Sequence, residues 1–149
     1  AFLYASNFSL GVNLFFELNA KLADMMQKQP LYTASIEEIH HNQKRDTPSG
    51  TSLSLASSVT EGNKKIKRHL YREKNANKAR EKNEIGFASI RGGDVVGEHS
   101  VYFFLDGERL ELKHIASDRK VFSIGAIKAA KWLYNKKPGL YTIMDMVKN

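Results

Sequence analysis

The feature that most constrains the fold is a run of strand-like segments in the second half of the chain. Residues Ile85 to Ile90, Gly97 to Leu105 and Arg109 to Ile115 are rich in β-branched and aromatic side chains. An Asp106-Gly107 pair separates the last two, and Asp-Gly between apolar strands is typical of a tight hairpin turn. These segments predict a mainly antiparallel sheet.

Helical periodicity surrounds these strands. A first helix is expected to follow a cap at residues 7–9 and to end before Pro30, and a second opens at residues 49–51. Residues 123–134 carry an apolar stripe that predicts a third helix. Between the first two helices, residues 33–41 alternate in the manner of a strand.

This order of elements indicates the α+β class. We expect a mixed, mainly antiparallel sheet with helices on one face, which leaves the other face available for oligomerisation. The chain has 149 residues, of which 42% are hydrophobic, and this is enough for one buried core. We therefore expect residues 1–149 to form a single domain.

The net charge of +7 is concentrated in one segment. Residues 64–82 hold nine basic and two acidic side chains. A nucleic-acid-binding arm is one interpretation. Such runs are usually solvated, and no aromatic platform accompanies this one, so a surface loop without a nucleic-acid partner is the preferred interpretation.

Other classes of protein are disfavoured. No apolar stretch approaches the roughly 20 residues of a membrane-spanning helix, and the first residues do not resemble a secretory signal. The chain has no cysteine, which excludes disulfides and thiolate catalysis. We expect a cytoplasmic protein without a membrane partner.

The chemistry-bearing residues cluster between Glu38 and Thr51. His40 can donate or accept a proton near neutrality, and Lys44 adds a positive charge and a second acid. Residues 49–51 open a helix whose free amides form a cradle for a carboxylate or phosphate, although a plain turn and N-cap gives the same pattern. The segment therefore suits the protonation of an anion-like intermediate.

Two other kinds of site are not expected here. His40 and His41 are adjacent and point to opposite faces of a regular strand, so we expect no metal site. Ser49 lacks the Gly-x-Ser-x-Gly elbow of a serine hydrolase. Because no glycine-rich nucleotide fingerprint is present, any dinucleotide must be held mainly by residues outside this chain.

The motif His40-His41-x-x-Lys44-x-Asp46-x-Pro48-Ser49-Gly50-Thr51 resembles the dihydrodipicolinate (4-hydroxy-tetrahydrodipicolinate) reductase family. Residues 5–13, 85–94, 97–99 and 107–111 resemble further family segments in the same order. The likeness extends through most of the chain. It departs at residues 74–80, a place where the family commonly has glycines.

The resemblance implies a two-domain oxidoreductase of lysine (diaminopimelate) biosynthesis. Its N-terminal Rossmann domain, absent here, binds NADPH or NADH. Residues 1–149 correspond to the C-terminal domain, which binds a small dicarboxylate substrate and builds a homotetramer through its sheet. The reaction reduces a cyclic unsaturated dicarboxylate to tetrahydrodipicolinate, and we expect no turnover from this part alone. The sequence does not distinguish NADH from NADPH.

The resemblance also implies residue roles. His40 corresponds to the proton donor and acceptor, and Lys44 to the proton donor. The implied substrate-binding residues are His41, Ser49, Gly50 and Thr51. The implied contacts to the nicotinamide end of the cofactor are Ala5, Ser6, Asn7 and Phe8. A non-catalytic assembly or binding module that keeps the fold is the alternative.

Overall fold

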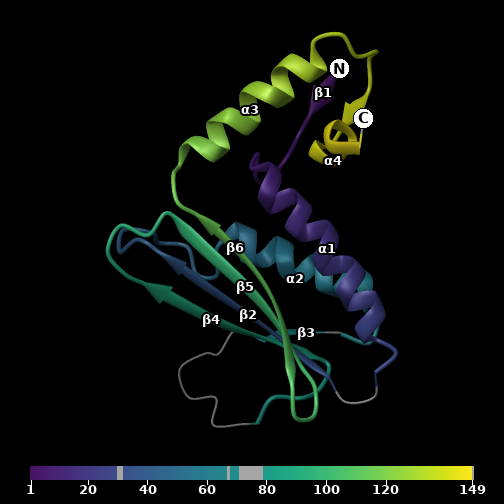
Figure 1. The fold of residues 1–149 in the computed structure, drawn as a ribbon, viewed down its shortest axis with the longest axis vertical. Coiled ribbons are helices and arrows are strands. Elements are labelled where there is room, and N and C mark those ends of the chain that lie inside the picture. The colour runs from purple at the N-terminus through teal and green to yellow at the C-terminus, as the bar shows by residue number, and fades with distance from the viewer. Residues whose placement is uncertain (30–31, 67, 71–78, 149) are drawn as a thin grey trace.

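The structure is a computed structural model that describes residues 1–29, 32–66, 68–70 and 79–148, with residues 68–70 described by their backbone alone. A sheet with two helices on one face forms the larger part (Figure 1). A third helix and both chain ends lie apart from this sheet. The two parts meet near the start of the first helix.

In the described part of the chain, the main sheet has five strands in the order β3-β4-β2-β5-β6. β2 lies at its centre, parallel to β4 and antiparallel to β5; β3 is parallel to β4, and β5 and β6 form an antiparallel hairpin. The longer pairings are antiparallel, and Gly107 adopts the positive φ of 78° that the predicted turn requires. The strands are β2 (Thr33–His40), β3 (Arg68–Leu70), β4 (Glu84–Arg91), β5 (Gly97–Phe104) and β6 (Arg109–Ala116).

Helices α1 (Leu10–Met26) and α2 (Gly50–Gly62) cover the inner face of the sheet (Figure 1). Ser9 and Ser49 cap them, since each side chain accepts a hydrogen bond from the amide three residues later. Asn19 joins the helices by donating to the carbonyl of Leu55 at 3.0 Å and to Ser58 at 2.7 Å. The core lies between these helices and the sheet; its largest side chains include Phe15, Ile36, Leu55, Ile85 and Phe103. The prediction of an α+β fold with a mixed sheet is therefore confirmed.

Helix α3 (Lys120–Leu133) exists as predicted but begins three residues earlier and runs away from the sheet (Figure 1). Its backbone approaches the N-terminal segment so closely that a Cβ on Gly125 would lie 1.9 Å from the carbonyl oxygen of Phe8. Ile124 and Ile127 on its apolar stripe are about half exposed. The periodicity predicted a helix with one apolar face, but it did not predict what that face would contact.

Short elements complete this outlying part. β1 (Phe2–Leu3) pairs in parallel with β7 (Leu140–Tyr141), and α4 (Ile143–Lys148) packs beside α1 and α3. The sequence did not predict β3, β7 or α4. Much of the basic segment 64–82, interpreted as a surface loop, lies outside the described residues. Within the described ranges, no helix is long and apolar enough to cross a membrane.

Candidate active site

The segment singled out by the sequence surrounds a cavity of about 160 Å³ at the end of β2. This volume suits a ligand with a single small ring, because typical sites for larger molecules enclose roughly 300–1,000 Å³. The walls come from β2 and the loop after it, the first turn of α2, the start of β5 and the end of β6, and also from the start of α1 with the segment before it and the start of α3. The lining residues are Asn7, Val12, His40, His41, Lys44, Thr51, Val96, Gly97, His99, His114, Ala116, Arg119 and Phe122.

Both adjacent histidines reach this cavity. β2 ends at His40, so strand alternation stops there and the side chain of His41 turns into the same space. The sequence-based argument that they must face opposite ways therefore does not hold. His40 is buried, and burial lowers the pKa of its imidazole below the usual value, although the negative charge of Glu38 opposes this shift. The ring of His40 is therefore neutral at neutral pH.

Gly97 makes room for the ring of His40. A Cβ at position 97 would lie 3.2 Å from Nε2 of His40, which is tighter than an ordinary van der Waals contact. Any larger side chain at this position would displace the imidazole. The close approach of His40 therefore explains why position 97 is a glycine.

Lys44 lies on the loop between β2 and α2. Its Nζ is 2.8 Å from the carboxylate of Asp46, which is exposed. Its backbone amide donates to the carbonyl of His41 at 3.1 Å, so a tight turn brings the lysine back towards the cavity that the histidine lines. The structure thus brings a neutral imidazole and a paired cation to one space.

Not all of the residues predicted at the first turn of α2 line the cavity. Thr51 lines the cavity, and its hydroxyl accepts a hydrogen bond from the side chain of Asn7 at 3.3 Å. The side chain of Ser49 is buried and does not line the cavity, because its hydroxyl caps the helix and contacts His99. Gly50 is exposed, with open space where a Cβ would stand. A ligand contact from Ser49 through its hydroxyl is therefore not favoured by this arrangement.

The four residues predicted to contact a cofactor lie in different places. Asn7 lines the cavity with His40. Ala5 and Ser6 line a separate depression between α2 and α4, and the backbone of Phe8 lies against α3. Among residues 5–8, Asn7 is thus the one that lines the same cavity as His40.

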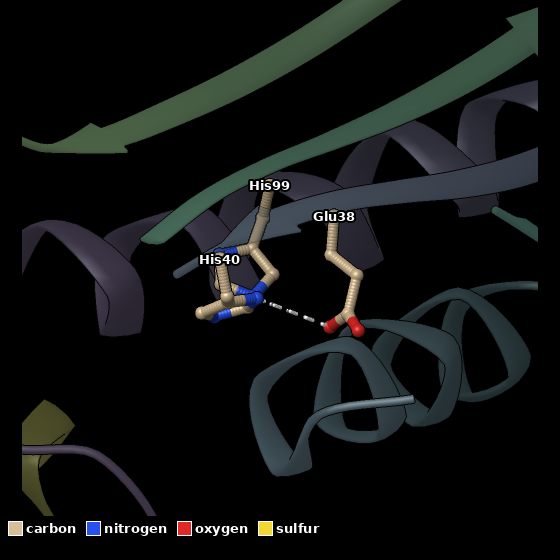
Figure 2. A group of neighbouring side chains, drawn as sticks. All are labelled: Glu38, His40 and His99. Atoms are coloured by element: carbon tan, nitrogen blue, oxygen red, sulfur yellow. Dashed lines mark ion pairs between the residues drawn. The ribbon is translucent and has the colours of Figure 1, made fainter. Parts of the chain in front are cut away.

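Three residues that no sequence pattern singled out organise the site: Glu38, Arg91 and His99. Glu38 lies two positions before His40 and is 1% exposed; its Oε2 is 3.8 Å from Nδ1 of His40 and 3.9 Å from Nε2 of His99 (Figure 2). The rings of His40 and His99 meet edge to face, with centroids 4.9 Å apart. Arg91, the third residue, pairs with Glu38 at 2.9 Å. Period-two alternation on β2 was the available signal for Glu38, since it places that residue on the face of His40.

Glu38, His40 and His99 also form a possible set of metal ligands, because their donor atoms lie within 4.8 Å of one another. The carboxylate is already engaged, however. Oε2 accepts from the amide of Ser49 and the hydroxyl of Ser52, and Oε1 accepts from the guanidinium of Arg91. A cation would have to replace these donors beside a positive charge. The cluster therefore fits a hydrogen-bonded ion-pair network better than a metal site.

Taken together, the cavity can hold an anion and move a proton. Thr51 and the helix N-terminus offer donors and the positive end of the helix dipole, and Lys44 adds a full charge. Burial also lowers the pKa of His99, to about 4, so this ring adds no cation at neutral pH. The positive charge at the cavity thus comes from Lys44 and Arg119.

Known proteins resemble this chain over most of its length. Residues 11–147 match the family model described as "Dihydrodipicolinate reductase, C-terminus". The 4-hydroxy-tetrahydrodipicolinate reductases of Magnetococcus marinus and Aquifex aeolicus are 44% and 46% identical to the chain over 97% of its length. A solved structure, dipicolinate-bound dihydrodipicolinate reductase from Paenisporosarcina sp. TG-14, superimposes with a TM-score of 0.71 at 25% identity, covering 94% of this chain and 52% of that one.

The chain spans about half the length of these curated relatives, 54% in both cases. The family model covers nearly all of the chain, including β2, α2 and α3. The chain belongs to the dihydrodipicolinate reductase family and matches its C-terminal region.

Proposed function

We propose that this chain is the substrate-binding, catalytic and oligomerising domain of a 4-hydroxy-tetrahydrodipicolinate reductase of lysine biosynthesis. The observation that carries the proposal is the convergence of His40, Lys44 and Thr51 on one small cavity. The whole enzyme reduces a cyclic unsaturated dicarboxylate to tetrahydrodipicolinate, and it works in the cytoplasm. An N-terminal Rossmann domain outside this chain supplies the NADH or NADPH that delivers the hydride.

The cavity meets the needs of this reaction. One carboxylate of the substrate binds at the first turn of α2 through Thr51 and the neighbouring amides. Hydride addition leaves a carbanion-like centre that must be protonated; Lys44 is the acid within reach, and the neutral imidazole of His40 can accept and pass on a proton beside it. The structure of the Paenisporosarcina enzyme has dipicolinate bound, and dipicolinate is an aromatic dicarboxylate. Asn7, beside Thr51, is the contact that we assign to the cofactor side.

Calorimetric titration with dipicolinate tests the substrate site. We expect this chain to bind dipicolinate saturably, and the substitution Thr51→Val to weaken binding about 10-fold, since it removes a hydroxyl donor to a charged ligand while keeping the shape of the side chain. Thr60→Val is the matched control, because Thr60 lies on the same helix and its hydroxyl donates to the carbonyl of Ala56 rather than facing the cavity.

The outcomes separate the two candidate functions. If the Thr51→Val variant binds dipicolinate as tightly as wild type, the hydroxyl of Thr51 is not part of the binding site. Saturable binding by a full-length protein that nevertheless fails to oxidise NADH or NADPH with substrate would favour a non-catalytic binding module. Binding together with turnover supports the reductase.

The outer face of the sheet is the surface that we assign to a homotetramer. It carries apolar and aromatic side chains on four strands, and Ile90 and Ile115 are 46% and 55% exposed. We expect the chain to sediment as a tetramer in analytical ultracentrifugation, and Ile115→Lys to reduce it to smaller species by placing a charge in the interface. A monomer at all concentrations would contradict this assignment. The apolar and aromatic residues of this outer face are Ile39, Ile90, Tyr102, Phe104 and Ile115.

A further inference from the structure

Glu38 is a buried carboxylate that has no role in the proposed reaction. It does not line the cavity, and its side chain points from near the end of β2 towards α2 (Figure 2). Its Oε2 accepts hydrogen bonds from the backbone amide of Ser49 at 2.9 Å and from the hydroxyl of Ser52 at 2.7 Å. A carboxylate that is this buried and bonded to a helix start fixes the helix relative to the strand.

These bonds decide which amides of α2 remain for a ligand. Glu38 occupies the amide of Ser49, and the hydroxyl of Ser49 occupies the amide of Ser52 at 3.2 Å. In the ranges that the structure describes, the amides of Gly50 and Thr51 have no acceptor from the protein. The first helical turn thus presents two adjacent donors beside the cavity.

Arg91 extends the same network to the catalytic loop. Its guanidinium donates to Glu38 at 2.9 Å and also to the carbonyl of Lys44 at 3.3 Å, the carbonyl of Asp46 at 2.7 Å and the hydroxyl of Thr47 at 2.9 Å. A planar fork with several fixed donors can hold a loop in one shape. The backbone that carries Lys44 is therefore tied to Glu38 through one side chain.

The network also reaches the histidines. The hydroxyl of Ser49 lies 3.2 Å from Nε2 of His99, and His99 packs edge to face against His40. Nδ1 of His40 is buried without a hydrogen-bond partner among the described residues, so packing and the nearby carboxylate orient this ring. Strand, loop and helix all meet at Glu38.

We infer that Glu38, acting with Arg91, is the positioning residue of the site: it sets the free amides of α2, the loop of Lys44 and the ring of His40 in one arrangement. Its effect on catalysis rests on the proposed reductase function. Its effect on geometry does not. Glu38 touches neither substrate nor cofactor, so it acts through Ser49, Ser52, Arg91 and His99.

Steady-state kinetics of the full-length reductase test the catalytic part. We expect Glu38→Gln and Arg91→Lys each to lower kcat/KM about 100-fold, the usual effect of misplacing reacting groups by about 1 Å. Arg91→Lys keeps the charge but loses the fork, so it separates geometry from charge and remains informative if Glu38→Gln folds poorly. Glu61→Gln, at the exposed end of α2, is the control and should keep wild-type rates. Rates within threefold of wild type in both variants overturn the inference.

Two NMR measurements on this chain separate positioning from general damage. Burial lowers the pKa of His40 most. Of the charged groups around it, Glu38 and Asp46 raise this pKa and Lys44 and Arg91 lower it, and the ring of His99 packs against it from β5. Titration should therefore show a lower pKa for His40 in Glu38→Gln and little change in Arg91→Lys. Hydrogen exchange of the Lys44 amide should quicken in Arg91→Lys. An unchanged titration and unchanged exchange overturn the inference, whereas a wild-type enzyme without turnover overturns only the proposed function.

Discussion

Replacing Lys44 with alanine in the full-length reductase will lower turnover by about 10²- to 10⁴-fold, the range that a positioned general acid contributes. Lys44 lines the cavity beside His40, and an alanine side chain can supply neither its proton nor its charge. Stability should change by less than about 1 kcal/mol, because Asp46, the ion-pair partner of Lys44, is exposed and pairs open to solvent contribute little. Single-turnover kinetics and thermal unfolding measure the two effects.

Arg45→Ala is the matched control for this loss. Arg45 is the next residue on the same loop, is exposed and does not line the cavity, so its replacement should leave turnover near wild type. Near-normal turnover in Lys44→Ala would refute its role as proton donor. A similar loss in both variants would instead point to the overall charge of the loop.

Acidification between pH 4.5 and pH 2 will remove about 3 kcal/mol of the free energy of unfolding through Glu38 alone. Hydrogen bonds from Ser49, Ser52 and Arg91 outweigh the cost of burial and lower the pKa of this carboxyl from 4.5 to about 2. Because the folded-state pKa lies below the unfolded one, the stabilisation is complete above pH 4.5 and is lost as pH falls towards 2. Each pKa unit corresponds to about 1.4 kcal/mol.

Urea unfolding of wild type and Glu38→Gln at several pH values isolates this contribution. The exposed carboxyls with lowered pKa, such as Asp46 and Asp145, are present in both proteins and cancel in the comparison. Wild type should lose its advantage over the variant as pH falls. Parallel curves over this range would show that Glu38 does not carry the acid sensitivity.

The sequence predicted the local elements well because their causes are local. Serine caps, period-two alternation and the Asp106-Gly107 turn each act over a few residues, and β2, α2 and the β5–β6 hairpin begin or end within about two residues of the expected positions. The path of α3 depended on what its apolar face would contact. That information lies in tertiary packing against the N-terminal segment and not in the helix itself.

The residues of the site were likewise predicted only in part. His40, His41, Lys44 and Thr51 were identified from residue type and from family resemblance, and they do line one cavity. Their chemical roles stay predictions. Ser49 was expected to contact the ligand, but an N-cap hydroxyl is turned inward by the bond that makes it a cap. His99 became visible only through strand pairing, which sets it opposite Glu38.

The ion pair between Glu38 and Arg91 joins residues 53 positions apart, across two parallel strands that enclose a long crossover. Contacts of such sequence separation are slow to form, because the chain between them must be ordered first. The cavity therefore exists only in the completed domain. A molecule that occupies the cavity binds the folded chain and not the unfolded one. Such a ligand shifts the folding equilibrium towards the native state, and the shift grows with its concentration.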